Sequence, residues 1–190
     1  MNVRDGETIY HQGAALDAVY RVQRGYVKLT RLTRDGGVTM LALLRTGDWF
    51  GALDGCGIAV DSASAKGPAL LRPRPRAEAL ASPSESAELI AALARQQRQL
   101  ARRLEALQWL DVRARLAAVL LDLAETCGQH CRHGHEIDVR LTHQELAELA
   151  GISRPVVTAT LNRWRSDKLV AYTRQYICIE QRETFADLIR

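Results

Sequence analysis

The stretch 141-LTHQELAELAGISRPVVTATLNRWRSDKLV-170 decides the fold of this 190-residue chain. Thr142 stands one residue before a helical pattern, and Glu145 follows three residues later, which is the spacing of a capping box. Gly151 suits the left-handed backbone conformation that ends many helices. These signals predict a helix over residues 143–150, with both of its ends marked by residue type.

A second helix is predicted over residues 154–168, after a short turn. Ser153 can cap it, and Pro155 lies in its first turn, where a missing backbone N–H does no harm. We expect an inward face of Val157, Leu161 and Trp164, and an outward face of Arg154, Pro155, Thr158, Ala159 and Asn162. A short turn between two helices, with a polar outer face on the second, is the geometry that enters a DNA major groove. An ordinary helical hairpin has the same spacing, but the order of cap, glycine and Ser-Arg favours the helix-turn-helix.

Composition allows a hydrophobic core, because apolar residues make up 47% of the chain. No apolar run approaches the ~18 residues that span a bilayer. The first ten residues lack an apolar signal core, so we expect a cytoplasmic protein without a membrane partner. The four cysteines then argue against a disulfide framework. A net charge of +4 permits a nucleic-acid partner, but the excess of arginine lies in residues 66–115, outside the helix-turn-helix. The prediction of DNA binding therefore rests on the helix-turn-helix motif and not on the charge.

Residues 1–80 are predicted to be all β, because short apolar stretches alternate with glycine-containing turns. Asp35-Gly36 is a hairpin signal between two of these stretches. Many short strands at this spacing indicate a barrel or jelly roll. The expected strands cover residues 7–11, 18–24, 26–33 and 38–46.

A long helix without internal glycine or proline is predicted to follow, over residues 84–110. Its heptad a and d positions are Ile90, Leu93, Gln97, Leu100, Leu104 and Leu107. The polar Gln97 at an a position can fix the register of two paired helices. We favour a parallel dimeric coiled coil over the alternative, a helix packed only on its own domain. Asp111 is then expected to start another helix, over residues 112–125.

The remaining residues, 126–190, are predicted to form a small α/β module around the helix-turn-helix. A strand is expected over residues 137–141 and a strand–turn–strand ribbon over residues 169–180.

With these elements in order, the chain resembles the Crp/Fnr family of bacterial transcription regulators over nearly its whole length. The glycine spacing of the family's β-roll appears in 5-DGETIYHQGAALDAVYRVQRGYVKL-29 and 47-GDWFG-51, and the most specific match is 142-THQELAELAGISRPVV-157. The resemblance implies an α+β fold and a homodimer that binds double-stranded DNA and RNA polymerase, in most members as an activator. It divides the chain into a β-roll sensor-like domain (1–83), a dimerisation helix (84–110) and a winged helix-turn-helix (111–190).

The recognition helix departs from the family pattern, which is a Ser-Arg pair, then Glu, with a second Arg one turn later. Ser153 and Arg154 keep the pair, whereas Pro155 and Ala159 stand in the other two positions. A bidentate contact from Arg154 to guanine O6 and N7 is worth roughly 1–3 kcal/mol of discrimination. We therefore expect a half-site unlike that of the cyclic-AMP receptor, with more weight on DNA shape and phosphates. The resemblance places phosphate contacts at Thr142, Gln144, Ser153 and Thr173.

The nucleotide-binding residues of the family are also missing. Cyclic-AMP-binding members use a Glu for the ribose and an Arg for the phosphate. Ala52 stands in the Glu position, and Ser62-Ala63 stands where Arg-Ser is expected, with the acidic Asp61 beside it. Lys66 is a conceivable substitute cation, but we interpret it as a solvated turn lysine. We expect no cyclic-nucleotide binding and no cofactor.

The chain also has few of the residues with which other branches of the family bind an iron–sulfur cluster or a haem. No cysteine precedes Cys56, which argues against an N-terminal iron–sulfur cluster, and residues 12–129 contain no histidine for a haem. Five metal-ligand types crowd into residues 127–135, namely Cys127, His130, Cys131, His133 and His135. They permit a tetrahedral zinc site, but their spacing matches no standard zinc motif, so we interpret the segment as a polar surface loop, with the zinc site as the alternative. Cys56 is either a redox thiol or a small apolar filler, and Cys178 carries no signal.

Two other classes of function fit less well. No nucleophile–base set, phosphate loop or paired-carboxylate motif is found, so we do not expect an enzyme. A ligand-binding module without DNA activity would not need the well-formed segment 142–170. A metal- or redox-responsive regulator of the same fold is the alternative within the same class.

Overall fold

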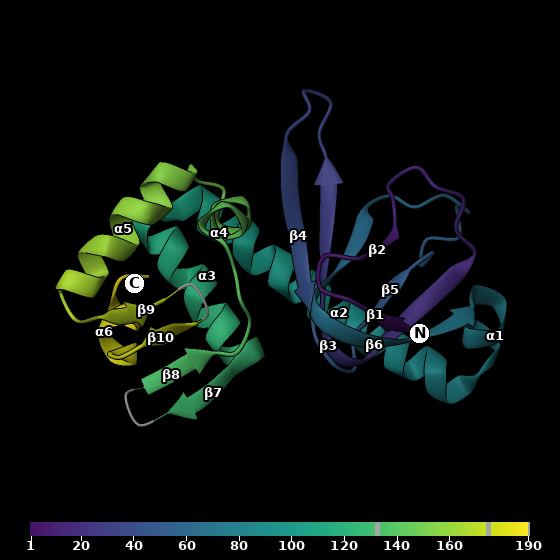
Figure 1. Ribbon diagram of the computed structural model, residues 1–190. Coiled ribbons are helices and arrows are strands. Elements are labelled where there is room, and N and C mark those ends of the chain that lie inside the picture. Colours follow the sequence, from purple (N-terminus) through teal and green to yellow (C-terminus); the bar gives the residue numbers. More distant parts are fainter. Residues whose placement is uncertain (132–133, 174–175, 190) are drawn as a thin grey trace. The chain divides into compact units, whose positions relative to one another are not determined.

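The computed structural model describes residues 1–131, 134–173 and 176–189, and the chain divides into two compact units, Met1–Leu100 and Ala101–Arg190 (Figure 1). None of the helices in the described ranges is long and apolar enough to cross a membrane. In the first unit the elements are β1 (Asn2–Val3), β2 (Thr8–Tyr10), β3 (Ala18–Leu32), β4 (Val38–Leu44), β5 (Trp49–Gly51), β6 (Ser62–Pro75), α1 (Arg76–Ala81) and the start of α2 (Pro83–Trp109). The second unit holds the rest of α2, then α3 (Val112–Cys127), β7 (Gly128–Cys131), β8 (Gly134–Ile137), α4 (His143–Ala150), α5 (Arg154–Ser166), β9 (Val170–Tyr172), β10 (Ile177–Ile179) and α6 (Arg182–Asp187).

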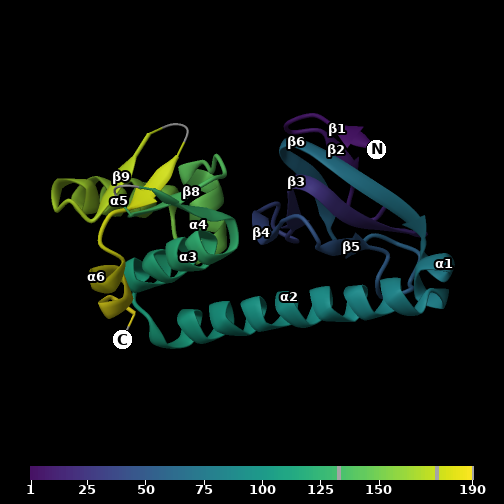
Figure 2. The ribbon, with the colours of Figure 1, turned by 90° about the horizontal axis from the view of Figure 1, so that it is seen from below.

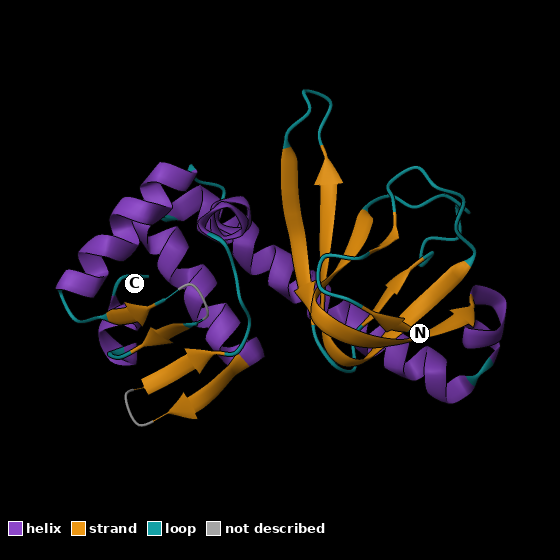
Figure 3. Ribbon diagram, viewed as in Figure 1, coloured by secondary structure: helices purple, strands orange, loops and turns teal. Residues whose placement is uncertain are grey.

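Strand β3 is the centre of the antiparallel sheet of the first unit (Figure 3). It pairs with β6 over most of its length, and with β5 and β4 on its other edge. The two strands predicted over 18–24 and 26–33 are in fact one strand of 15 residues, so that prediction was wrong. Gly25 is not a turn but a point inside the strand where the pairing shifts register, with φ +86°. A side chain there would lie 2.5 Å from the carbonyl oxygen of Pro68.

An aromatic cluster fills the interior of this sheet. The rings of Tyr20 and Phe50 stack with centroids 5.2 Å apart, and Tyr10 lies 6.1 Å from each of them. Aliphatic side chains from β3, β4 and β6 complete the same core. The β-roll is therefore packed with its own side chains.

The chain leaves the sheet through α1, a short helix that begins inside the range 1–80, which was predicted to be an all-β domain. Ser86 of α2 donates its hydroxyl hydrogen bond to the carbonyl oxygen of Leu80, 2.7 Å away, and so ties the two helices together. Helix α2 itself agrees with the predicted range 84–110 within one residue at each end, and Figure 2 shows it uninterrupted.

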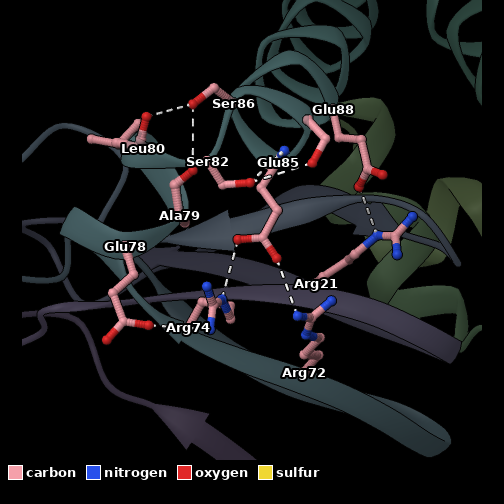
Figure 4. Close-up of polar contacts among 11 residues, drawn as sticks. Arg21, Arg72, Arg74, Glu78, Ala79, Leu80, Ser82, Glu85, Ser86 and Glu88 are labelled. Atoms are coloured by element: carbon pink, nitrogen blue, oxygen red, sulfur yellow. Dashed lines mark hydrogen bonds and ion pairs between the residues drawn. The ribbon is translucent and has the colours of Figure 1, made fainter.

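Glu85 and Glu88 of α2 form ion pairs with three arginines of the sheet (Figure 4). Arg21 of β3 and Arg72 of β6 are cross-strand partners, and like charges opposite each other destabilise a sheet. Glu88 lies 3.1 Å from Arg21, whereas Glu85 lies 3.2 Å from Arg72 and 3.1 Å from Arg74. Glu85 is the most enclosed member, with its side chain 13% exposed. The start of α2 thus supplies the negative charge that these strands need.

The predicted heptad positions of α2 lie on a different face from its buried residues. Leu89 and Ala92 are buried with Trp49 of β5. The heptad residues are all exposed, and these are Ile90, Leu93, Gln97, Leu100, Leu104 and Leu107. We call these six residues the seam.

The second unit corrects the strand predicted over 137–141. Strand β8 ends at Ile137, and residues 138–141 are not in a strand. The segment interpreted as a surface loop, 127–135, instead contributes the last residue of α3, strand β7 and the start of β8, and the two strands pair antiparallel. A four-stranded sheet results, in the order β7-β8-β10-β9, in which β9 and β10 confirm the predicted ribbon.

Helix α3 begins as predicted. The Asp111 carboxylate accepts hydrogen bonds from the backbone N–H groups of Arg113 and Ala114, at 2.8 and 2.9 Å. The helix runs two residues past the predicted end, to Cys127, and α6 was not predicted.

Candidate nucleic-acid interface

Helix α4 has the predicted capping box. Thr142 Oγ1 accepts a hydrogen bond from the Glu145 backbone N–H at 3.1 Å, and Glu145 Oε2 accepts one from the Thr142 N–H at 2.8 Å. At the other end Gly151 has φ +62° and ψ +42°, the left-handed conformation expected there. Local sequence therefore fixes both ends of α4 and the direction in which the chain enters α5.

The inward face of α5 is buried as predicted. Val157 and Leu161 have no exposed surface, and Trp164 packs its ring edge-on against Phe185 of α6, with centroids 4.7 Å apart. This packing fixes the rotation of α5 about its own axis. The opposite face is consequently the one turned to solvent.

Ser153 stands at the N-cap position of α5, but its side chain makes no capping hydrogen bond, which corrects the predicted cap. An N-cap side chain normally accepts from the second or third N–H of the helix. Pro155 occupies the second position and has no N–H, so one of the two usual donors is missing.

The outward face of α5 matches the sequence prediction. Arg154, Pro155, Ala159 and Asn162 are exposed, and Thr158 is half-buried. The residues predicted to contact phosphates, Thr142, Gln144, Ser153 and Thr173, are exposed as well. Gln144 donates a hydrogen bond to Glu148, one turn later on α4, at 3.1 Å.

Three residues that were not predicted complete this face: His143, Arg165 and Tyr172. His143 Nδ1 lies 2.8 Å from Thr158 Oγ1, and its ring meets the Tyr172 ring edge-on at 5.7 Å. Tyr172 donates its hydroxyl hydrogen bond to Asn162 Oδ1, 2.8 Å away. These contacts join α4, α5 and β9, and no short-range sequence signal reports them.

The charge state of His143 follows from its surroundings. Burial, followed by the positive charge of Arg154, lowers the pKa of His143 below its usual value of 6.5. The shift favours the neutral form of the imidazole. Thr158 Oγ1 lies within hydrogen-bond distance of both the Arg154 carbonyl oxygen, at 3.1 Å, and His143 Nδ1, at 2.8 Å, and so links the two residues.

The metal candidates of residues 127–135 are only partly brought together. His130 and His135 face each other across the β7–β8 hairpin with ring centroids 4.0 Å apart, and Cys127 is buried. Within the described ranges, no three His, Cys, Asp or Glu side chains are placed to hold a metal ion. His133 lies outside the described residues.

The same sheet gives Cys178 a neighbour that its sequence position did not suggest. Its sulfur lies 3.4 Å from that of Cys131, although 47 residues separate the two. Burial, together with Cys131, raises the pKa of the Cys178 thiol to about 12. Local sequence could not predict this pair of thiols, because the two cysteines are far apart in the chain.

In the first unit, two of the positions that replace nucleotide-binding residues belong to the packed core, whereas Ser62 is half-buried and its hydroxyl oxygen accepts a hydrogen bond from the Gln12 backbone N–H at 2.9 Å. Ala52 and Ala63 are buried. Asp61 Oδ1 accepts a hydrogen bond from the Tyr10 hydroxyl at 2.9 Å, and burial raises the pKa of the Asp61 carboxyl. Cys56 is exposed, and its hydrogen bond with Asp54 raises the pKa of its thiol. None of these groups adds a positive charge for a phosphate.

Comparison with known proteins agrees with this architecture in both units. Residues 1–71 match the model of the cyclic nucleotide-binding domain, and residues 114–188 match that of the Crp-like helix-turn-helix domain. The global nitrogen regulator of Nostoc sp. is 30% identical over 188 residues, which cover 95% of this chain and 84% of the relative. The transcriptional regulator LdrP of Thermus thermophilus is 32% identical over 178 residues, covering 90% and 88% of the two chains.

A solved structure shows the same fold. The crystal structure of a Crp/Fnr-family transcriptional regulator from Thermus thermophilus superposes with a TM-score of 0.84 at 25% identity, covering 100% of this chain and 97% of the other. The β-roll, the long helix and the helix-turn-helix thus occur together, in the same order, in a regulator of known structure. This chain belongs to the Crp/Fnr family of transcription regulators.

Proposed function

We propose that the protein is a homodimer that binds a pseudo-palindromic promoter site without cyclic AMP and activates transcription through contact with RNA polymerase. The observation that carries the proposal is the orientation of α5, whose buried face leaves Arg154 and its exposed neighbours on the opposite side. In this proposal residues 1–83 are a sensor-like domain, residues 84–110 form the dimer, and residues 111–190 bind DNA. Two such helices would enter successive major grooves about one helical turn apart.

Within each half-site, Arg154 is the main base-reading residue of this proposal. Its exposed guanidinium can take guanine O6 and N7 together, the commonest specific contact in the major groove. Pro155 and Ala159 offer no hydrogen-bond donor or charge at the two positions where relatives place Glu and Arg. Exposed Thr142, Gln144, Ser153 and Thr173 are suited to phosphate contacts, which position the protein without reading sequence.

The proposed dimer rests on the seam of α2. Its apolar members are 38–67% exposed, although they repeat at the spacing that two parallel helices bury between them. A row of exposed leucines along one helix is typical of a surface that a partner covers. A second copy presents the same row and is therefore the simplest partner.

Independence from cyclic AMP rests on the interior of the β-roll. Ala52 and the Ser62-Ala63 pair provide neither a carboxylate for the ribose nor a guanidinium for the phosphate. The carboxylate of Asp61, held by Tyr10, would repel an anion. We propose that the free protein is already able to bind DNA and that its abundance controls the target genes.

Selection of DNA sequences by the purified protein tests the proposal. We expect an inverted repeat whose half-sites are one helical turn apart, recovered equally with and without cyclic AMP. The selected site, placed upstream of a promoter, should increase transcription by bacterial RNA polymerase in vitro. Failure to enrich any sequence would contradict the proposed function, and recovery of the cyclic-AMP receptor's consensus would contradict the predicted half-site.

A redox-responsive regulator is the second candidate, supported by the Cys131–Cys178 pair, whose sulfurs lie 3.4 Å apart. In this reaction the Cys131 thiolate attacks a low-molecular-weight disulfide and releases one small thiolate. Cys178 then loses its proton to solvent and attacks the Cys131 sulfur, releasing the second. Two protein thiols and one small disulfide thus yield one protein disulfide, of length about 2.05 Å, and two small thiols.

The thiol pair can be tested with oxidised glutathione in a Cys56→Ser background, which removes the exposed cysteine. We expect a loss of two thiols, counted in denaturant after an acid quench, together with a changed affinity for the selected site. Adding Cys131→Ser should abolish disulfide formation and the change in affinity. Retention of both thiols in the Cys56→Ser protein would contradict this function.

A further inference from the structure

We infer that Tyr172 and Arg165 are positioning residues that hold the carbonyl oxygen of Asn162, so that Asn162 faces DNA with its amide N–H groups alone. The inference rests on the proposed function, because it concerns the base-reading face of α5. It would make Asn162 a reader of hydrogen-bond acceptors and exclude the two-point contact with adenine that asparagine commonly makes.

Two donors meet at a single atom of Asn162. The Tyr172 hydroxyl lies 2.8 Å from Oδ1, and Arg165 Nη2 lies 3.3 Å from the same atom. A guanidinium can only donate hydrogen bonds, so its neighbour must be the carbonyl oxygen and not the amide nitrogen. The arginine contact therefore fixes which way the amide of Asn162 is turned.

Further contacts hold the two donors in place. The guanidinium of Arg165 stands over the Tyr172 ring, with its central carbon 5.1 Å from the ring centroid. His143 of α4 also contacts that ring, in an edge-on arrangement with 5.7 Å between centroids. Tyr172 itself belongs to β9, whose pairing with β10 fixes its backbone. The orientation of Asn162 is thus set by α4, α5 and β9 together.

Asn162 lies on the DNA-facing line of the helix. Arg154, Thr158 and Asn162 follow one another at intervals of four residues, which places them on one face. Arg154 and Asn162 are both exposed on it, and His143 fixes the hydroxyl of Thr158 between them. Asn162 therefore lies on the same side of α5 as Arg154, about two turns away.

The chemistry of recognition follows from the occupied oxygen. A carbonyl oxygen has two lone pairs, and two donors already use them. Two-point reading of adenine needs that oxygen to accept from the N6 amine while the amide nitrogen donates to N7. Only the two N–H groups remain, and their partners on DNA are acceptors: guanine O6 and N7, thymine O4, or a phosphate oxygen.

The test compares DNA selection and binding curves for the natural protein, Asn162→Ala and Tyr172→Phe. Tyr172→Phe removes the hydroxyl but keeps the ring that Arg165 and His143 contact. Where Asn162 meets a base, Asn162→Ala should erase a preference for guanine or thymine at one position of the half-site. Tyr172→Phe should then raise the relative affinity for adenine at that position, by roughly 2- to 10-fold for one freed hydrogen-bond acceptor.

A phosphate partner gives a different pattern that supports the same inference. Asn162→Ala and Tyr172→Phe should then both weaken binding to every sequence by a similar factor and leave the selected site unchanged. Arg165→Met is the second variant, since it frees the oxygen from the other side and should act in the same direction as Tyr172→Phe. Tyr176→Phe, which removes a hydroxyl from the other end of the same ribbon turn, is the matched control and should behave as the natural protein does.

Three results would overturn the inference. One is a preference for adenine in the natural protein that Asn162→Ala removes. Another is a Tyr172→Phe protein, folded by circular dichroism, that matches the natural protein in both sequence preference and affinity. The third is no effect of Asn162→Ala. If the natural protein selects no sequence at all, the proposed function itself has failed, and this outcome is distinct from the other three.

Discussion

The β-roll and the helix-turn-helix of this protein have kept different parts of the family's design. The β-roll keeps the strands, the glycine positions and a full aromatic core, but the charged groups that take a cyclic nucleotide are absent. The helix-turn-helix keeps both end signals of α4, the turn that follows, and an outward face with Arg154. The packed core of the β-roll keeps its fold stable without a bound ligand. The DNA-facing surface of α5, in contrast, depends on which exposed side chains the sequence provides. The difference is the basis of our proposal that the protein binds DNA without cyclic AMP.

The largest expected effect comes from separating the two copies. Leu100→Glu places a charge in the seam at a residue that is 51% exposed in the single chain, so the fold should survive. We expect a monomer in light scattering and a loss of about 100-fold or more in operator affinity, because two linked contacts become independent. Ala91→Glu puts the same charge on an exposed position outside the seam and should remain a dimer. A dimeric Leu100→Glu protein would show that the two copies meet elsewhere.

Arg154→Ala should have the next largest effect. Loss of a two-point contact with guanine is worth roughly 1–3 kcal/mol, or about 5- to 150-fold in affinity for the selected site. The melting temperature should stay the same, since the side chain is exposed. Arg163→Ala, which removes a positive charge from the Pro155-Ala159-Arg163 row of the same helix, is the comparison variant. Equal losses in the two variants would mean that α5 contributes only general positive charge.

Thr142→Ala tests how far the reading face depends on the capping box of α4. Removing the cap should lower the free energy of unfolding of the DNA-free protein by about 1 kcal/mol. Thr142→Ser keeps the hydroxyl and should retain most of that stability. Thermal or urea unfolding measures the loss without DNA, and therefore separates it from the proposed phosphate contact. An unchanged stability would show that packing alone fixes α4.

We expect cyclic AMP to have no effect on the protein, which is the smallest effect among these predictions. This experiment tests the contrast between the β-roll and the helix-turn-helix most directly. Ser62 stands where the family arginine is expected and Ala52 is buried where a glutamate would stand, while Arg31, the nearby arginine, donates to the carbonyl oxygen of Val60 at 3.2 Å and lies close to the Asp61 carboxylate. Calorimetry should detect no binding, and the melting temperature should not rise with added nucleotide. Tight binding would mean that the β-roll has kept its sensor chemistry with other residues.

Sequence signals that act over a few residues predicted the helix-turn-helix closely. Helix α4 has the predicted bounds because Thr142, Glu145 and Gly151 mark its ends through local backbone hydrogen bonds. The long helix was predicted equally well, since no glycine or proline interrupts its apolar repeat. Gly25 misled the strand prediction, because a glycine with positive φ serves a register shift within a strand as well as a turn.

The sequence could not predict the contacts between different helices and strands. The Cys131–Cys178 pair depends on β7 and β10 lying on either side of β8, and the contacts of His143 with Thr158 and Tyr172 depend on three elements meeting. A periodic pattern gives the inward and outward faces of each helix or strand. It does not say which outward faces meet one another, and here those meetings orient the groups on the reading face.

The ion pairs of Glu85 have a further consequence for how strand β6 is aligned. The strand reads Arg72-Pro73-Arg74-Pro75, so the two arginines that share Glu85 are separated by one residue and point to the same face of the sheet. A slip of one residue against β3 would turn both guanidinium groups to the other face and present prolines to the carboxylate. The half-buried carboxylate of Glu85 would then lack any partner from β6. One glutamate at the start of the long helix thus distinguishes the correct strand alignment from its nearest alternatives.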